Sequence, residues 1–364
     1  MKKNIMFIIP TLTQGGAERV VVTLLNNLSK DDFDLSILVV NMKDDIYSEE
    51  LPPEINLINL KCGRVRYALP KIILSIWRNK PDIVFSTIGY LNLAMAILIP
   101  VMPRSVRFVA RETIVVSEGL SRVRFPRLWK IWYRYLYPSF DKVICQSKDM
   151  LTDLVSITGN CQNLVLINNP IDYKRVRKIM IINEPSTADF FNDESKTTFV
   201  AAGRLTSQKG FELLIKAVAL TQNPNIKLAI LGDGPLKESL QTLIQSLNLD
   251  KNVILMGFQS NPYAWISRAD AFILSSYYEG FPNVILEALA CGTPVISTPA
   301  PGGCQEILGD IQGCYLADNI TATSLSESIT LFIESPKVIM KESVVAPYGV
   351  QKIVQQYQHI FSDL

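Results

Sequence analysis

Residues Tyr277–Thr298, YYEGFPNVILEALACGTPVIST, carry the clearest fold signal of their part of the chain. It follows an apolar run, residues 271–276 (AFILSS), which is typical of a buried strand. A short polar loop comes next, and Pro282 suits the first turn of a helix over residues 283–291. Residues 292–298 then return as a second strand, after a Gly-Thr-Pro turn. The order strand, loop, helix, strand predicts one unit of a parallel α/β sheet.

Two glutamates of this stretch have different places in the predicted unit. Glu279 stands at the carboxyl end of the strand, whereas Glu287 lies more than one turn inside the helix. The helix N-terminus, from Phe281 to Val284, offers main-chain groups and positive dipole charge to an anion. A carboxylate next to an anion site is a good acceptor for hydroxyl donors, so the pair fits a ligand that has both phosphates and hydroxyls. The alternative is two solvated surface charges, and the flanking GFPN and GTPV turns favour the ligand hypothesis.

A second group of polar residues lies in AAGRLTSQKG, residues 201–210. Arg204 ends a predicted strand, and Lys209 follows just before a helix that begins near Gly210. Two cations at the carboxyl end of a strand suit a diphosphate, with the arginine binding as a fork and the lysine as a point charge. Taken alone, these residues would be interpreted as ordinary surface cations.

A third group, TLTQGGAERV (residues 11–20), leads from the first predicted strand into the first helix. Gly15 and Gly16 allow the backbone to approach an anion or a sugar closely. The segment does not match the G-x-G-x-x-G pattern of dinucleotide-binding proteins, and it is not a P-loop.

Apolar strands alternate with helical segments along the whole chain. Together they predict an α/β fold of two tandem, doubly wound Rossmann-like domains, with a ligand cleft between them. We expect domain boundaries of 1–170 and 198–345, a linker at 171–197, and a C-terminal helix at 346–364 that packs on one of the domains. The expected strands are 4–10, 34–40, 82–87, 106–112, 142–147 and 164–170 in the first half, and 197–205, 226–235, 252–258, 270–276, 294–298 and 313–316 in the second.

Charge is distributed unevenly over the 364 residues, although the net charge is only +2. Residues 1–175 contain 23 Lys and Arg against 16 Asp and Glu, and the segment Lys61–Arg134 contains 14 against 3. This asymmetry predicts that the first half faces an anionic surface or ligand. The six cysteines are scattered, which favours unpaired thiols in a reducing, cytoplasmic compartment.

Two basic stretches, residues 62–80 and 121–138, interleave cations with Trp, Tyr and Phe. On helices, this composition suits the interface of an anionic membrane. The alternative is half-buried helices with cationic rims, and nucleic acid is not expected because no recognition motif accompanies the cations. Residues 83–102 carry almost no charge and are nearly long enough to span a bilayer, but polar interruptions favour a strand followed by a buried helix.

The motifs GGAERV, AAGRLTSQKGFELLI, LGDGP, ILMGF and YYEGFPNVILEALACGTPVIST occur in an order and at a spacing that resembles the retaining GT-B glycosyltransferases of family 4. The resemblance covers essentially the whole chain and is tightest from Val200 to Ile307. The GGAER start is similar to bacterial members that build capsule, O-antigen or lipid-linked oligosaccharides.

The resemblance implies a role for each motif. Arg204 and Lys209 would bind the donor diphosphate, Glu287 the ribose, and Glu279 the donor sugar. The remaining donor contacts that it implies are Gly15, Gly16, Gly257, Phe258, Phe281, Pro282, Asn283 and Val284. The donor would be a UDP-sugar, and the acceptor a saccharide carried on a lipid diphosphate at the inner face of the cytoplasmic membrane.

The sequence departs from the family at one point. Many members have a histidine at the end of an N-domain strand, but the only histidine here is His359, which we expect on the surface of the last helix. Arg111 and Glu112 stand at the matching place, and we assign them an active-site role; the alternative is a salt-bridged strand end. No clustering of Cys and His predicts a metal site, so a mechanism without metal or other cofactor is expected.

Two other classes of function remain open from the sequence. One is a nucleotide-sugar epimerase of the same architecture, which the lack of cleft histidines disfavours. The other is a non-catalytic subunit that binds a sugar or nucleotide, which the presence of Arg204, Lys209, Glu279 and Glu287 together disfavours.

Overall fold

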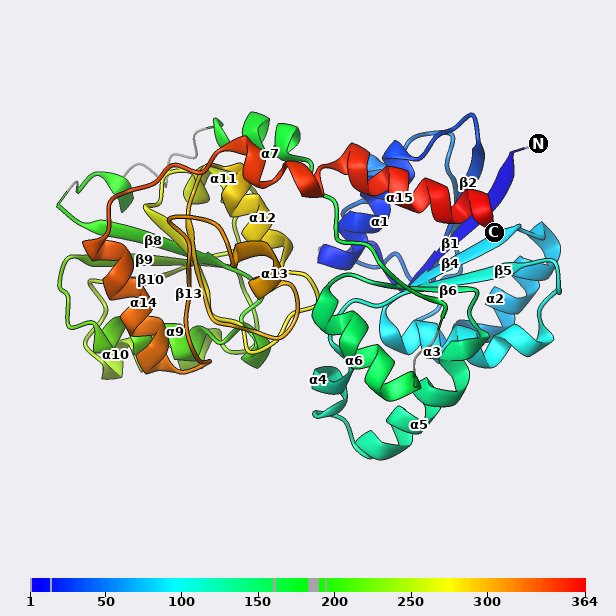
Figure 1. Ribbon diagram of the computed structural model, residues 1–364, viewed down its shortest axis with the longest axis horizontal. Coiled ribbons are helices and arrows are strands. Elements are labelled where there is room, and N and C mark those ends of the chain that lie inside the picture. Colours follow the sequence, from blue (N-terminus) through cyan, green and yellow to red (C-terminus); the bar gives the residue numbers. More distant parts are fainter. Residues whose placement is uncertain (1, 14, 160–161, 183–189, 194) are drawn as a thin grey trace. The chain divides into compact units, whose positions relative to one another are not determined.

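The computed structural model describes residues 2–13, 15–159, 162–182, 190–193 and 195–364. Contacts divide the chain into two compact units (Figure 1). Unit 1 is Met1–Pro170 with Val350–Leu364, and unit 2 is Ile171–Gly349. Both are α/β units with an all-parallel sheet, as the alternating pattern of the sequence predicts.

Unit 1 has a seven-stranded parallel sheet of order β3-β2-β1-β4-β5-β6-β7. Its strands are β1 (Lys3–Ile9), β2 (Phe33–Val39), β3 (Asn56–Asn59), β4 (Ile83–Thr87), β5 (Arg107–Arg111), β6 (Lys142–Cys145) and β7 (Leu164–Leu166). Its helices are α1 (Gly16–Asn27), α2 (Val65–Asn79), α3 (Gly89–Leu98), α4 (Val116–Leu120), α5 (Pro126–Leu136), α6 (Lys148–Thr158) and α15 (Val350–Asp363). Six of the seven strands were expected; β3 was not, because its four residues lie mostly exposed at the edge of the sheet and lack an apolar run.

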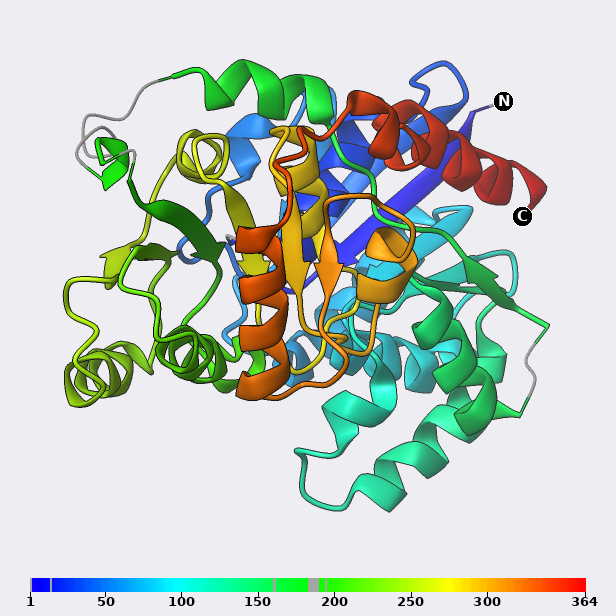
Figure 2. The same ribbon diagram turned by 60° about the vertical axis from the view of Figure 1, so that its left-hand side comes forward.

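Two hydrophobic clusters cover the two faces of this sheet. One joins the strands to α2, α3, α5 and α6. The other joins them to α1 and α15, where Tyr357 and Phe361 meet Phe7 and Phe85 in edge-on ring contacts. Figure 2 shows α15, in red, beside the blue strand β1, so the last residues of the chain complete the core of unit 1.

The segment 83–102 is a buried strand followed by a helix, as expected, and not a membrane span. Thr87 ends β4, and α3 begins at Gly89. Within the described ranges, every helix is too short or too polar to cross a bilayer.

Unit 2 has a six-stranded parallel sheet of order β10-β9-β8-β11-β12-β13. Its strands are β8 (Thr197–Ala202), β9 (Ile226–Leu231), β10 (Val253–Gly257), β11 (Ala271–Leu274), β12 (Val295–Ser297) and β13 (Tyr315–Leu316). Its helices are α7 (Tyr173–Met180), α9 (Phe211–Leu220), α10 (Lys237–Ser246), α11 (Pro262–Ile266), α12 (Asn283–Ala290), α13 (Cys304–Leu308) and α14 (Ala322–Glu334). All six expected strands of this half are present.

The range 171–197, predicted as a linker, contains a helix. Helix α7 packs through Val176 into the same hydrophobic cluster as α11 and α12. Residues 183–189 and 194 of this range lie outside the described residues.

Candidate functional site

The strand order of unit 2 reverses between β8 and β11, and the loops that follow these two strands lie next to each other. In open α/β sheets, ligands bind at the carboxyl edge beside such a reversal. Side chains and backbone join the loops: Ser275 Oγ donates to the carbonyl oxygen of Lys209 at 2.8 Å, and the Tyr277 amide donates to the carbonyl oxygen of Gln208 at 2.8 Å. Gln208 Nε2 donates in return to the carbonyl oxygen of Tyr278 at 3.0 Å. The two motifs that contain Lys209 and Glu279 therefore form one surface.

Lys209 and Glu279 form an ion pair at this edge, with 2.6 Å between Nζ and Oε1. Ser276 Oγ donates to the same carboxylate oxygen at 2.6 Å. The Glu279 side chain is only 8% exposed, while that of Lys209 is 23% exposed. A carboxylate this buried is held in one orientation, whereas the lysine keeps access to a solute.

The loop after β12 packs directly against the loop that carries Glu279. A Cβ on Gly302 would lie 2.8 Å from the carbonyl oxygen of Glu279, and φ of +128° at Gly302 favours glycine. A Cβ on Gly303 would lie 2.5 Å from the ring of Phe281. The Glu279 amide donates to the carbonyl oxygen of Pro301 at 2.8 Å, which fixes the backbone of the two loops. The second glycine-bearing turn of the sequence thus supports the site.

Helix α12 begins at Asn283, so Pro282 is its N-cap residue and not, as expected, part of its first turn. The N-terminus of α12 therefore follows directly after the loop that carries Glu279. The side chain of the N-cap residue, Pro282, accepts no hydrogen bond from the first turn. Glu287 lies further along α12, half-buried, and Tyr263 donates to its Oε1 at 3.4 Å. Glu279 and Glu287 are therefore held by different partners, on a loop and on a helix.

The other predicted donor residues of unit 2 follow β8 and β10. Arg204 is exposed directly after Gly203, and no described carboxylate pairs with it. Gly257 ends β10 with φ of +71°, and a Cβ there would meet nothing within 4 Å. Phe258, the next residue, is 56% exposed, which leaves its ring open to stacking.

In unit 1, α1 begins at Gly16, after the carboxyl end of β1, and Gly15 is its N-cap residue. A Cβ on Gly15 would lie 2.1 Å from Oε2 of Glu18, so the side chain of Glu18 folds back over the turn. Glu18 is 8% exposed, and Thr11 Oγ1 donates to its Oε1 at 3.3 Å. Sequence reasoning did not single out Glu18; its place three residues after the N-cap, where glutamate closes a capping box, was the available signal.

Arg111, at the end of β5, is fully buried. Its Nη2 donates to Asn169 Oδ1 at 2.6 Å and its Nη1 to Thr87 Oγ1 at 3.3 Å. Burial lowers the pKa of Arg111, and the nearby hydroxyl group of Tyr357, from α15, opposes that shift. The guanidinium is thus held by polar groups from several parts of unit 1.

Glu112 is also fully buried, on the side of the sheet opposite Arg111, because successive residues of an extended chain alternate. Its Oε1 accepts from Asn92 Nδ2 at 3.0 Å and from the hydroxyl of Tyr137. Burial raises the pKa of Glu112, and these hydrogen bonds oppose that shift. The two residues form no ion pair with each other, so the salt-bridged strand end that the sequence left open is absent from the described contacts.

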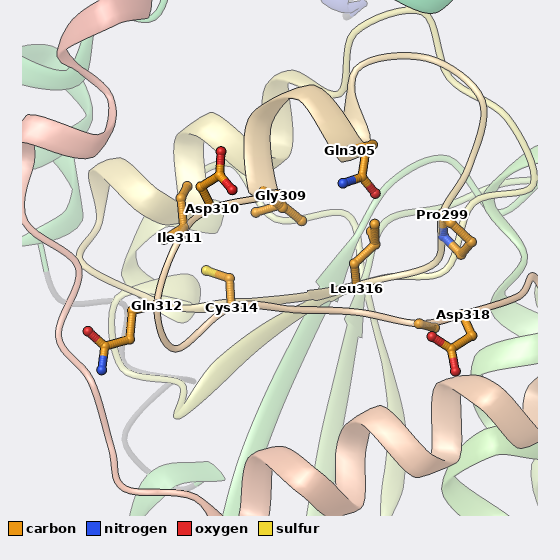
Figure 3. A pocket seen from close by; sticks show the side chains of 11 residues that line it. Pro299, Gln305, Gly309, Asp310, Ile311, Gln312, Cys314, Leu316 and Asp318 are labelled. Carbon is orange, nitrogen blue, oxygen red and sulfur yellow. The ribbon is translucent and has the colours of Figure 1, made fainter.

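A separate hollow of about 610 Å³ lies beside α13 and β13 (Figure 3). Its lining includes Gln305, Asp310, Gln312, Cys314 and Asp318. None of the predicted site residues lines it, and we assign it no function. The residues that the structure describes contain no group of three or more His, Cys, Asp or Glu arranged to hold a metal ion. His359, as expected, is exposed on α15.

Comparisons with known proteins identify both halves of the chain. Residues 14–175 match the family model described as Glycosyltransferase Family 4, and residues 184–345 match the one described as Glycosyl transferases group 1. The N-acetylgalactosamine-N,N'-diacetylbacillosaminyl-diphospho-undecaprenol 4-alpha-N-acetylgalactosaminyltransferase of Campylobacter jejuni is 30% identical over 340 residues, which cover 90% of this chain and 89% of that protein. The lipopolysaccharide core biosynthesis glycosyltransferase LpsE of Rhizobium meliloti is 28% identical, over 86% of this chain and 89% of LpsE.

Solved structures share the fold. Anabaena HepE, crystallised with UDP and glucose, superposes with a TM-score of 0.81 at 18% identity, over 100% of both chains. Sucrose-phosphate synthase from Thermosynechococcus elongatus superposes with a TM-score of 0.83 at 18% identity, over 100% of this chain and 99% of the synthase. Two parallel-sheet units, both family models and a relative that matches 90% of the chain agree. The chain therefore belongs to the glycosyltransferases of the GT-B fold, with a family 4 region followed by a group 1 region.

Proposed function

We propose that this glycosyltransferase transfers a hexose or N-acetylhexosamine from a UDP-sugar to a saccharide carried on a lipid diphosphate, with retention of the anomeric configuration. The product would belong to a cell-surface polysaccharide, and the enzyme would act at the inner face of the cytoplasmic membrane. The observation that carries the proposal is the Lys209–Glu279–Ser276 cluster, which lies at the strand reversal of unit 2 and next to the N-terminus of α12. The named activity of the Campylobacter jejuni relative supports the lipid-linked acceptor.

Each residue has a chemical role in this proposal. Lys209 exchanges its partner Glu279 for the donor diphosphate, which Arg204 also binds. Glu279, fixed by Ser276, then accepts a hydrogen bond from a hydroxyl of the donor sugar.

Further along the site, Glu287 accepts from the ribose hydroxyls and Phe258 stacks beside the base, next to the backbone of Gly257. Main-chain groups of Phe281, Pro282, Asn283 and Val284 contact sugar and phosphate. The roles assigned to Gly15, Gly16, Arg111 and Glu112 in unit 1 stay predictions. In the described conformation, Arg111 and Glu112 are closed off from solvent.

The proposed reaction needs no base from the protein. The acceptor hydroxyl attacks the anomeric carbon on the face from which the nucleotide leaves. A bond forms between the acceptor oxygen and that carbon, the bond from the carbon to the diphosphate oxygen breaks, and the leaving phosphate takes the hydroxyl proton. The cations Arg204 and Lys209 stabilise the charge that develops on the diphosphate.

A donor screen tests this function. The protein is incubated with UDP-, GDP- and other nucleotide sugars together with a lipid-diphosphate saccharide, and the released nucleotide and the extended lipid are both measured. We expect turnover with a UDP-sugar and an α-linked product from an α-linked donor. A product sugar that is altered but still attached to the nucleotide would identify an epimerase, and binding without any turnover would identify a non-catalytic subunit.

A further inference from the structure

The two helical faces of unit 1 differ sharply in their exposed side chains. None of the large hydrophobic residues of α1 and α15 is exposed. Helices α2, α3 and α5, which contact one another in that order on the opposite face (Figure 1), carry many. The exposed ones are Tyr67, Leu74 and Trp77 of α2, Tyr90 and Ile97 of α3, and Leu128, Ile131, Trp132 and Tyr135 of α5. We call the outer surface of these three helices the α2–α3–α5 face.

Helix α5 carries two apolar stripes, of which only one packs against the core of unit 1. Trp129, Tyr133 and Leu136 face the core. The residues Leu128, Ile131, Trp132 and Tyr135 follow the spacing i, i+3, i+4, i+7 and form a second stripe, which is exposed. Tyr135, the most exposed of them, has 73% of its surface open to solvent. A soluble protein gains nothing from such a stripe unless something covers it.

The charges of the α2–α3–α5 face are all of one sign. The three helices contain Arg66, Lys71, Arg78, Arg127, Lys130 and Arg134, but no Asp or Glu. On α5, the three cations lie between the exposed apolar stripe and the core-facing one, since Arg127, Lys130 and Arg134 share the spacing i, i+3, i+7. Aromatic side chains with a flanking basic stripe are the composition that settles at the headgroup level of an anionic bilayer.

We propose that the α2–α3–α5 face of unit 1 docks on an anionic lipid bilayer, with the stripe Leu128, Ile131, Trp132 and Tyr135 inserted at the headgroup level. The charge excludes a second copy of the same face, because a symmetric dimer would bring cations against cations. Only the role of this docking rests on the proposed function: it would bring the enzyme to an acceptor that is held in the membrane. The basic stretches of the sequence indicated a membrane; the structure adds which face of unit 1 and which stripe of α5 would meet it, and that the opposite face exposes no large hydrophobic residue of α1 or α15.

Two variants test the surface. One changes the stripe, Ile131→Ser, Trp132→Ser and Tyr135→Ser, and the other removes its charges, Arg127→Gln, Lys130→Gln and Arg134→Gln. The matched control removes three exposed cations elsewhere, Lys251→Gln, Lys341→Gln and Lys352→Gln. Full-length proteins are sedimented with vesicles of phosphatidylcholine alone and of phosphatidylcholine with phosphatidylglycerol.

We expect the unmodified protein and the control to bind only the anionic vesicles, and salt to weaken that binding. The charge variant should bind at least about 10-fold more weakly, because it loses three cations that attract an anionic surface. The stripe variant should also bind at least about 10-fold more weakly, because it has fewer apolar side chains to bury at the headgroup level. The proposal is overturned if the unmodified protein does not bind anionic vesicles, or if it binds the neutral and the anionic vesicles with equal affinity. It is also overturned if the two face variants bind anionic vesicles as tightly as the control variant does. Light scattering could also show that the unmodified protein is a dimer and that the stripe variant is a monomer. That result would overturn the proposal, because the face would then bind a second copy of this chain and not a membrane.

An activity assay separates this proposal from the proposed function. With a water-soluble acceptor analogue, both face variants should turn over UDP-sugar at the unmodified rate; with the lipid-linked acceptor in anionic vesicles they should be slower. Loss of vesicle binding with full activity on the soluble acceptor supports the docking face. If the protein binds anionic vesicles but turns over no donor, the result supports the docking face and refutes the proposed function.

Discussion

The carboxyl edges of the two sheets carry similar residue types in different environments. In unit 2, Lys209 and Glu279 form an ion pair whose lysine is partly open to solvent, on loops that hydrogen bonds and glycine contacts hold together. In unit 1, Arg111 and Glu112 are completely buried, on opposite sides of the sheet, and their partners are protein groups. An arginine or a glutamate at a strand end is therefore a stronger candidate for a ligand contact if it, or the group that it pairs with, is accessible to solvent.

The same comparison separates two costs of mutation. Removing a residue from the site of unit 2, where the ion pair of Glu279 is partly open to solvent through Lys209, should affect binding or turnover more than the fold. Removing a buried charge of unit 1 leaves its partners unpaired in the interior and should cost stability first.

Glu279→Ala should have the largest effect. It removes the carboxylate that we place on the donor sugar, so transfer should fall by about 100-fold or more, by analogy with the loss of one preorganised hydrogen-bonding group in an active site. UDP binding should change little, and the thermal midpoint should stay close to that of the unmodified protein. Transfer assays, UDP calorimetry and a thermal melt provide the three measurements, and normal turnover would refute the role of Glu279.

Arg204→Ala combined with Lys209→Ala should weaken UDP binding by roughly 100-fold. Each cation contributes charge-assisted hydrogen bonds to the diphosphate, at about 1.5–3 kcal/mol apiece. Uridine, which has no phosphate, serves as the control ligand, because its weak binding should not change. If calorimetry finds the same UDP affinity in the double variant, the diphosphate assignment is wrong.

Glu112→Ala should destabilise unit 1 by about 2–4 kcal/mol, because it leaves Asn92 and Tyr137 without their acceptor in a buried site. Glu112→Gln is the matched control. The glutamine keeps an oxygen in the place of Oε1, which accepts from Asn92 and Tyr137. Its NH2 group takes the place of Oε2, which accepts no hydrogen bond from a described residue. Chemical denaturation followed by circular dichroism measures both variants. An alanine variant that is as stable as the glutamine variant, but inactive, would favour the catalytic role predicted for Glu112 from the sequence.

The smallest effect concerns pH. Burial raises the pKa of Glu112 above its ordinary value of 4.5, so the folded protein binds this proton more tightly than the unfolded chain does. The stability that this proton provides is complete below the unfolded-state pKa and is lost as pH rises through the folded-state pKa. Glu112→Gln has no proton to lose, and its free energy of unfolding relative to the unmodified protein should therefore increase as the pH rises from the ordinary pKa of a glutamate into the neutral range. A difference that stays constant over this range would show that Glu112 is ionised in both states.

Much of unit 2 was predictable because its signals are local. The Gly-Pro turns, the alternation of strand and helix, and the positions of Arg204, Lys209 and Glu279 at strand ends can all be seen within a few residues of sequence. The one-residue error at Pro282 is of the same local kind: proline is compatible with both the N-cap and the first helical position, and only the helix geometry distinguishes them.

Unit 1 was harder because its decisive contacts join distant parts of the chain. Arg111 meets Asn169, 58 residues away, and Tyr357 reaches the same cluster from the last helix. The fold-back of Glu18 over Gly15 is local, yet it was missed because the N-cap position is glycine and the capping pattern usually begins with Ser or Thr.

By itself, the sequence determined two parallel α/β sheets, their strand order along the chain, and a set of polar residues at strand ends, since hydrophobic periodicity and turn chemistry act over a few residues. Only the tertiary structure decided which of those residues are open to a ligand, which side of a sheet each one occupies, and that α5 carries an apolar stripe facing away from the core. The burial of a side chain depends on its contacts with elements that are far away in the sequence, and a short stretch of sequence does not specify those contacts.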